Sequence, residues 1–276
     1  MWQQDMLLED QCWAAFRDGD HEEAVYLLPL VEELKEIKRN YGLIWKNTSL
    51  LQLSSRNGWL DVTKDLITKY HCDPYECDEG AQNCLDWAAE GNHVDTMRYL
   101  INECHCNPMA INAYGDTVLH KAAANGSFNV IKFLISHHHC DPKAITISGQ
   151  TALHCAARHI DIIKYLIDEC HCDPMATNDE GETVLHKAAN EGSLDAMKFL
   201  ISHHHCDPKA ADFSGQTVLH CAARYIDIIK YLIDECHCDL MATDDDGKTV
   251  LHCAADHIDI IKYFINKRHC DLMATD

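Results

Sequence analysis

The chain repeats itself at a nearly constant interval, and this repeat constrains its fold more than any other feature. The marker is a histidine followed by cysteine and then by aspartate or asparagine, and its copies begin at His71, His105, His139, His171, His205, His237 and His269. Successive copies are 34, 34, 32, 34, 32 and 32 residues apart. A sequence with this period folds as a stack of small units that pack against their neighbours. The repeat therefore overrides the two globular domains that a length of 276 residues would otherwise suggest.

A second motif, Thr-x-Leu-His, follows the same period, and each copy is followed one residue later by a pair of alanines. The copies begin at Thr117, Thr151, Thr183, Thr217 and Thr249. Two degenerate copies lie upstream, at Ser49-Leu50-Leu51-Gln52 and Asn83-Cys84-Leu85-Asp86. A period near 33 residues that carries this motif is the ankyrin signature. The chain therefore resembles an ankyrin repeat protein over nearly all its length.

This resemblance implies an all-α repeat solenoid, in which helix-turn-helix units alternate with β-turn fingers, with about eight helix pairs. The sequence of each unit agrees: threonine suits a helix N-cap, and the proline of His-Cys-Asp-Pro ends the second helix. We expect about seven repeats over residues 48–276. Residues 1–47 are expected to form an atypical N-terminal capping helix pair, over 11–28, with an extra helix over 30–39 after Pro29. Together they would make one elongated domain.

The repeats depart from the family pattern of Gly-Ala-Asp at the end of the second helix. Histidine stands where glycine would end a helix at positive φ, a conformation that histidine tolerates better than most residues. Cysteine stands where a small buried alanine is usual, which predicts a buried thiol. Three units lack two residues between their helices, at Ala157-Arg158-His159, Ala223-Arg224-Tyr225 and Ala255-Asp256-His257, which predicts a tighter turn there.

The cysteines and histidines offer one alternative function, the handling of a metal or of thiols. Cys104-His105-Cys106 and His137-His138-His139 are rich in possible zinc ligands. Zinc needs four tetrahedral donors, and C-x-C is not the usual C-x2-C chelate. The repeated Thr-x-Leu-His histidines point to a structural hydrogen bond in every unit, because catalysis rarely needs five copies of one base. We therefore expect no metal, no other cofactor and no enzymatic activity.

The charge of the chain restricts its partners. With 23 Lys and Arg against 44 Asp and Glu, the formal net charge is −21. Nucleic acids and anionic membranes both require a basic surface, so neither is expected as a partner. A protein with a basic patch would be attracted instead. No run of 18 apolar residues and no signal-like start are visible, and we expect the chain to be cytoplasmic.

Internal duplication indicates where the repeats differ from one another. Residues 137–176 and 203–242 differ at only 6 of 40 positions, and three of these, Ile145/Ala211, Thr146/Asp212 and Ile147/Phe213, lie together at a finger tip. In the ankyrin family such positions line the concave face and contact partners; relaxed constraint on exposed loops is the alternative. The candidate partner-binding residues are Tyr114, Ile145, Ile147, Arg158, His159, Asp179, Glu180, Glu182, Phe213, Arg224, Tyr225 and Asp245.

The last helix pair repeats the internal pattern instead of a polar cap. Its apolar residues, such as Leu251 and Ile260-Ile261, correspond to those of internal repeats, and only Lys267-Arg268 departs. A terminal repeat with this pattern leaves apolar surface uncovered. We expect this end to fray, to self-associate, or to be continued by residues beyond this chain.

Overall fold

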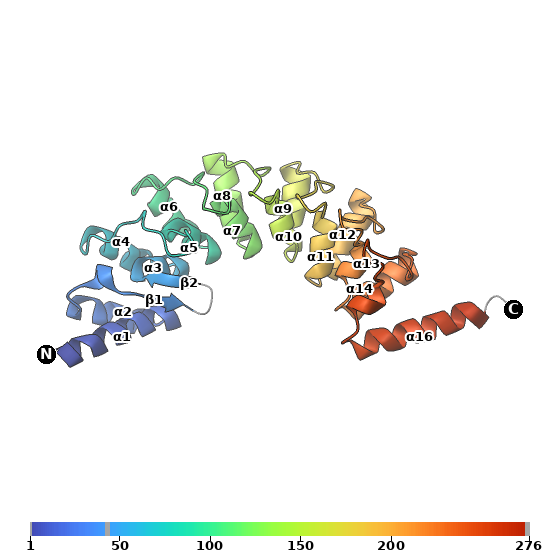
Figure 1. The fold of residues 1–276 in the computed structure, drawn as a ribbon. Coiled ribbons are helices and arrows are strands. Elements are labelled where there is room, and N and C mark those ends of the chain that lie inside the picture. Colours follow the sequence, from blue (N-terminus) through green and yellow to red (C-terminus); the bar gives the residue numbers. More distant parts are fainter. Residues whose placement is uncertain (1, 42–44, 274–276) are drawn as a thin grey trace. The chain divides into compact units, whose positions relative to one another are not determined.

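The computed structural model describes residues 2–41 and 45–273, and their structure consists mainly of helix pairs (Figure 1). Eight pairs lie within the described residues, as the repeat predicts. Contacts group the chain into two compact units, residues 1–147 and 148–276. Each unit is a stack of pairs, and the prediction of one elongated domain stays a prediction.

The first helix pair begins at Trp2, well before the pair expected over 11–28. Helix α1 (Trp2–Asp18) turns at Gly19 into α2 (His21–Leu27), and the Asp20 side chain caps α2 by accepting a hydrogen bond from the Glu23 N–H at 3.0 Å. Cys12 and Phe16 of α1 are fully buried. The pair therefore covers one end of the first unit with an apolar inner face.

The extra helix predicted over 30–39 is wrong. The chain forms two short 3-10 turns, η1 (Leu28–Leu30) and η2 (Leu34–Glu36), and then an antiparallel hairpin of β1 (Lys38–Tyr41) and β2 (Trp45–Ser49). The buried side chains Val31, Leu34 and Ile37 are spaced three residues apart, which suits a 3-10 or irregular path better than an α-helix. Pro29 therefore lies at the start of the 3-10 turn η1 and not of an α-helix.

Three full helix pairs follow in the first unit. They are α3 (Leu50–Asn57) with α4 (Leu60–Thr68), α5 (Cys84–Glu90) with α6 (Val94–Asn102), and α7 (Val118–Ala124) with α8 (Phe128–His138). The first helices of neighbouring pairs stack, α3 on α5 and α5 on α7. The alanine pairs of α5 and α7 are fully buried at this contact. Small side chains there allow the helices to approach closely, so that Leu85 and Leu119 are enclosed.

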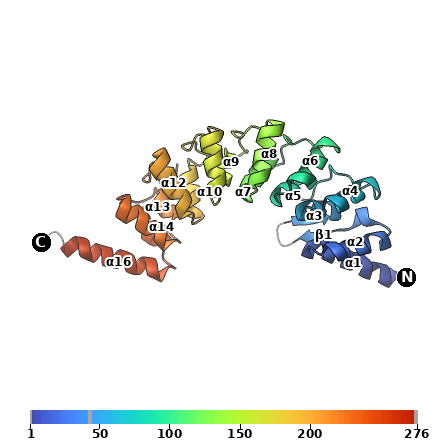
Figure 2. The same cartoon turned by 180° about the vertical axis from the view of Figure 1, so that it is seen from behind.

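Four pairs make up the second unit, which Figure 2 shows from behind. They are α9 (Ala152–Cys155) with α10 (Ile160–Lys164), α11 (Val184–Asn190) with α12 (Leu194–His204), α13 (Val218–Cys221) with α14 (Ile226–Lys230), and α15 (Val250–Cys253) with α16 (Ile258–Met273). Helices α10 and α14 continue as π-helical turns, η3 (Tyr165–Glu169) and η4 (Tyr231–Glu235). No helix in this unit or in the rest of the described chain is long and apolar enough to cross a membrane.

The shorter repeats lose residues from a helix and not from the turn. Helix α9 has 4 residues where α7 has 7. Four residues, 156–159, then connect α9 to α10, whereas only 125–127 connect α7 to α8. The prediction of a tighter turn is therefore wrong, because the two missing residues shorten the first helix.

The histidine that ends the second helix adopts the expected left-handed conformation in six repeats, whereas His269 lies within α16. Six of these histidines have φ between 52° and 58°, and they are His71, His105, His139, His171, His205 and His237. The next residue then turns back: the Cys140 N–H donates to the Leu134 carbonyl at 3.2 Å. This geometry ends the helix and directs the chain into the finger.

We predict that substitutions at His205 depend on backbone conformation alone, because its side chain is exposed and its φ is 54°. His205→Val should lower the free energy of unfolding by about 1–2 kcal/mol, since a β-branched residue is strained there. His205→Gly should be neutral or stabilising by up to about 1 kcal/mol. Urea unfolding measures both, and His203→Val within α12 is the control, expected to cost under about 0.7 kcal/mol. Equal stability of the valine and glycine variants at position 205 would contradict the prediction.

Candidate partner-binding surface

Each finger is shaped by a short polar side chain at its start. The Asn112 Oδ1 accepts hydrogen bonds from the backbone N–H groups of Tyr114, at 2.8 Å, and Asp116, at 3.0 Å. The same pair of bonds recurs at Asn178, Asp212 and Asp244. Asparagine and aspartate side chains replace a backbone acceptor in this way and fix a turn locally. The conformation of the finger is therefore specified within five residues.

Successive finger tips are joined by backbone hydrogen bonds within each unit. In the first unit the Ile147 N–H donates to the Tyr114 carbonyl at 3.1 Å. In the second unit the Asp179 N–H donates to the Ser148 carbonyl at 3.1 Å. The Phe213 N–H donates to the Glu180 carbonyl at 2.9 Å, and the Asp245 N–H donates to the Ser214 carbonyl at 3.1 Å. These bonds hold the tips in fixed spacing.

The approach of one finger to the next requires glycine at the tip. Gly181 has φ of +81°, and a Cβ on it would lie 2.6 Å from the Phe213 ring. Both the positive φ and the lack of room exclude other residues. The Phe213 side chain therefore rests with its edge against the backbone of the preceding tip.

The Thr-x-Leu-His histidines make the structural hydrogen bonds that their repetition predicts. The His120 Nδ1 accepts from the Thr117 N–H at 3.2 Å, so its Nε2 carries the proton and donates to the Ala144 carbonyl of the next finger at 3.0 Å. Equivalent bonds run from His154, His186 and His220 to the carbonyls of Glu182, Ala210 and Lys248. Each histidine thus caps its own helix and ties it to the next repeat.

The finger tips expose large apolar side chains. Tyr114, Ile145, Ile147 and Phe213 are 63%, 64%, 72% and 75% exposed. The acidic candidates Asp179, Glu180 and Asp245 are also exposed, at the tips of their own fingers. The finger tips thus keep these large apolar side chains in contact with water, and the side chains do not pack onto the core.

Other candidates are partly engaged within the protein. The Tyr225 ring is half-buried and lies over Gly192, where an added Cβ would meet it at 2.5 Å. Arg158 is exposed but forms an ion pair with Glu191. His159 is half-buried and Arg224 is exposed. These four lie at the turn between the two helices of a repeat and not at the finger tips.

Glu182 is anchored more firmly than the other acidic candidates. It is half-buried, accepts a hydrogen bond from the Asn178 Nδ2 at 2.8 Å and forms an ion pair with Lys187. Burial acts to raise the pKa of this carboxyl, but the contacts with Lys187 and Asn178 outweigh it and hold the pKa below the ordinary value. Glu182 therefore stabilises its own finger.

A set of exposed methionines beside the tips was not predicted from the sequence. Met109, Met175 and Met241 are 55%, 51% and 50% exposed, and Ile111 is 69% exposed. Each methionine lies three residues after a buried cysteine, at a position that Lys143 and Lys209 occupy in two of the other fingers and Tyr75 in the first. Their alternation with lysine was the signal that could have revealed them.

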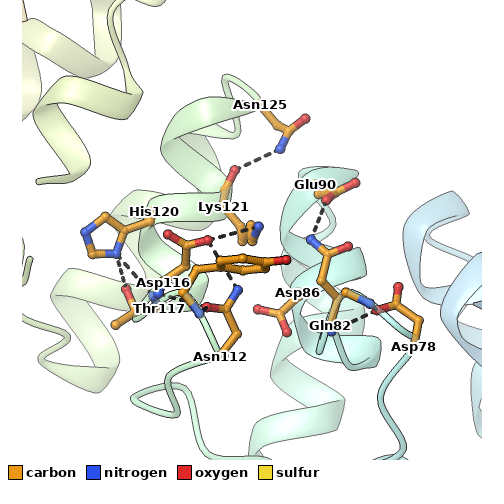
Figure 3. A network of polar contacts seen from close by, with 12 residues as sticks. Asp78, Gln82, Asp86, Glu90, Asn112, Asp116, Thr117, His120, Lys121 and Asn125 are labelled. Carbon is orange, nitrogen blue, oxygen red and sulfur yellow. Dashed lines mark hydrogen bonds and ion pairs between the residues drawn. The ribbon is translucent and has the colours of Figure 1, made fainter. Parts of the chain in front are cut away.

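A partly buried set of polar contacts in the first unit was also not predicted (Figure 3). The Gln82 Nε2 donates to Glu90 at 3.2 Å, and Lys121 forms an ion pair with Asp116 at 3.1 Å. Burial raises the pKa of Glu90, and it raises the pKa of Asp86 to about 6. Carboxylates this deeply placed are uncommon in a repeat core.

Five cysteines of the repeated tripeptide are buried, as expected for a position that alanine usually fills: Cys106, Cys140, Cys172, Cys206 and Cys238. Cys72 is half-buried. The Cys140 and Cys206 thiols each lie 3.9 Å from the carbonyl of a proline in the preceding finger. Burial raises the pKa of both thiols to about 11. Across the described residues no group of three or more His, Cys, Asp or Glu is placed to hold a metal ion. The handling of a metal or of thiols remains a separate hypothesis, for which elemental analysis is the direct test.

Stacked helix pairs, β-turn fingers and bridging histidines define a class of helical repeat protein. The family model for ankyrin repeats in three copies matches residues 104–178, 158–244 and 185–276, and the model for a single ankyrin repeat matches 82–113. The chain belongs to the ankyrin repeat family. The comparison with curated proteins finds no match.

We predict that acidification destabilises the fold through the bridging histidines. Burial lowers the pKa of His154 and His186 below the ordinary 6.5. The unfolded chain therefore takes up protons near pH 6.5 that the folded chain does not, and stability falls as pH drops below this value, by at most about 1.4 kcal/mol per pH unit for each histidine. The raised pKa of Asp86 has the opposite effect on stability, because the folded chain binds a proton there at a higher pH than the unfolded chain does.

Urea unfolding from pH 7.5 to 5 measures this effect against a double variant, His154→Gln with His186→Gln. Glutamine can both accept and donate at these positions but does not titrate, so the stability of the variant should depend less on pH. Parallel curves for the two proteins would contradict the prediction.

Proposed function

We propose that this chain is a non-catalytic module that binds a protein partner through its finger tips and the adjoining ends of its first helices. Ankyrin repeats are generally protein–protein interaction modules, and the chain belongs to that family. The observation that carries the proposal is the exposure of Tyr114, Ile147 and Phe213 at tips that hydrogen bonds hold in place. Large apolar side chains presented by a rigid backbone are the usual anchors of an interface.

The partner carries a basic patch. The net charge of −21 and the exposed carboxylates of Asp179, Glu180 and Asp245 would speed the encounter with such a surface more than they tighten the complex. A cytoplasmic location belongs to the same proposal. The alternative is that the chain is the recognition part of a larger protein. A pull-down from native lysate identifies the partner.

The last repeat supports a second proposal, self-association. Leu251, Ile258 and Ile265 are 42%, 68% and 57% exposed. Leu251 and Ile265 line a cavity of about 270 Å³ together with Phe264. We propose that a second copy of the chain covers this surface. Light scattering over a concentration series should show a mass that rises with concentration, and a constant monomer mass would contradict it.

We predict that the triple variant Tyr114→Ser, Ile147→Ser and Phe213→Ser keeps its fold and binds the captured partner at least about 2 kcal/mol more weakly. Tyr225 is left unchanged because its ring is half-buried on Gly192, whereas Phe213 is 75% exposed. Calorimetry measures the affinity, and circular dichroism measures the melting temperature.

The matched control replaces Val25, Tyr26 and Leu30 by serine; these residues are 45%, 66% and 48% exposed but lie outside the fingers. It should bind as tightly as the unaltered chain. Leu219→Ala instead removes a buried side chain and should cost about 2–5 kcal/mol of stability. Normal binding by the finger variant would show that the site lies elsewhere.

A further inference from the structure

Two cysteine side chains lie together in the first unit, at a place where the other repeats have only one. Cys84 is the first residue of α5, and Cys106 is the cysteine of the repeated tripeptide that follows α6. In the other repeats the position of Cys84 holds an aliphatic residue. These residues are Leu50, Val118, Ala152, Val184, Val218 and Val250. A second thiol beside the tripeptide cysteine is therefore particular to this repeat.

Both thiols lie close to the carbonyl oxygen of Pro74. The Cys84 thiol donates to this oxygen at 2.9 Å, and the Cys106 Sγ lies 4.0 Å from the same oxygen. The two thiols also lie within hydrogen-bond distance of each other. Cys84 is 1% and Cys106 is 4% exposed. The packing of the repeat therefore holds the two sulfurs side by side.

This contact gives the two thiols different acidities. When Cys106 loses its proton, the Cys84 thiol can donate to the Cys106 sulfur instead of to Pro74. The contact lowers the pKa of Cys106, although burial opposes it, and together with burial it raises the pKa of Cys84. At the same position in other repeats Cys140 and Cys206 face an aliphatic residue, and burial raises their pKa to about 11. Because the thiolate is the nucleophilic form of cysteine, Cys106 is the sulfur of the pair that reacts first.

A cavity of about 150 Å³ lies beside the pair. Polar and apolar side chains both line it, and among them are Asn83 and Asn107, the chain neighbours of Cys84 and Cys106. Cys77, which is exposed, lines the same cavity. A molecule as small as hydrogen peroxide therefore has space within one residue of either cysteine.

We propose that Cys84 and Cys106 form a disulfide when the chain meets a hydroperoxide, and that a dithiol reverses the reaction. In the first step the Cys106 thiolate attacks a peroxide oxygen, so that an S–O bond forms, the O–O bond breaks, and the leaving alkoxide takes a proton from solvent. In the second step the Cys84 sulfur attacks the Cys106 sulfur. The S–S bond forms, the S–O bond breaks, and the leaving hydroxide takes the Cys84 proton. Two thiols and one hydroperoxide thus give one disulfide, one alcohol and one water.

The bond joins the start of α5 to the segment that follows α6. It closes a loop over residues 84–106, which contains both helices of the repeat. A cross-link of this kind restricts the unfolded chain, so the oxidised repeat is the more stable one. The reaction concerns the thiols of the chain itself and does not depend on the proposed binding function.

The test treats the full chain with hydrogen peroxide, blocks the remaining thiols with N-ethylmaleimide and digests the product with trypsin. Cleavage after Lys69, Arg98 and Lys121 separates the two cysteines, so the disulfide joins peptides 70–98 and 99–121. Fragmentation of the joined peptides by mass spectrometry should place the bond between Cys84 and Cys106, at least about tenfold above any other link between them. Dithiothreitol should separate the peptides again. Cys140, which faces Val118, is the internal control and should be recovered as the blocked thiol.

Two variants complete the test. Cys84→Val introduces the residue that four other repeats carry at this position, so the chain should stay folded and the joined peptides should disappear. The double variant Cys77→Ser with Cys104→Ser leaves the pair intact and is the matched control, which should form the bond as readily as the unaltered chain. Oxidation should raise the melting temperature of the unaltered chain and of the control, but not that of Cys84→Val.

Three results would overturn the proposal. The first is a bond that runs through Cys77 or Cys104, or joined peptides that persist in Cys84→Val. The second is the absence of the bond at a peroxide concentration that oxidises the exposed Cys253. The third is the same mixture of links in the folded chain and in the chain unfolded by urea, because the fold would then not select this pair.

Discussion

The bridging histidine is the interaction on which the rest of the fold depends. It satisfies the free N–H at the start of the first helix and, through the opposite nitrogen, the carbonyl of the next finger. Both bonds require the neutral ring with its proton on Nε2. The His120 Nε2 donates to the Ala144 carbonyl, on the segment that enters the next finger. The His154 Nε2 donates instead to the Glu182 carbonyl, on the segment that leaves it. The same side chain can therefore join repeats of 34 and of 32 residues.

Rigid fingers follow from this arrangement. Each finger is closed by its own asparagine or aspartate, tied to the preceding repeat by the histidine, and joined to its neighbour tip by a backbone hydrogen bond. A side chain such as Phe213 is therefore presented without a large loss of freedom when a partner binds. In the proposed function the backbone fixes the positions of the exposed side chains, and residues such as Ile145 and Ala211, which differ between otherwise nearly identical repeats, would determine which partner they contact.

The sequence predicted what is local and repeated. The period, the capping threonines, the buried cysteines and the left-handed histidines depend on contacts within one repeat or between adjacent ones, and they agree with the structure. The segment after Pro29 could not be predicted in this way, because β1 is stabilised by pairing with β2, a contact that no helical periodicity records. Among the candidate site residues, exposure at the tips was predictable. The engagement of Glu182 with Lys187 and of Tyr225 with Gly192 depends on side-chain packing between neighbouring elements, which spacing alone does not show.

Amide hydrogen exchange of the chain, with and without its captured partner, tests the central claim most directly. The tip amides of residues 112–116, 146–149, 178–182 and 212–216 belong to the proposed surface. The account predicts that binding slows exchange there and at the starts of the following first helices, while the second helices α8 and α12 keep their exchange rates. Protection confined to the second helices, or to the exposed apolar end near Ile258 and Ile265, would contradict it.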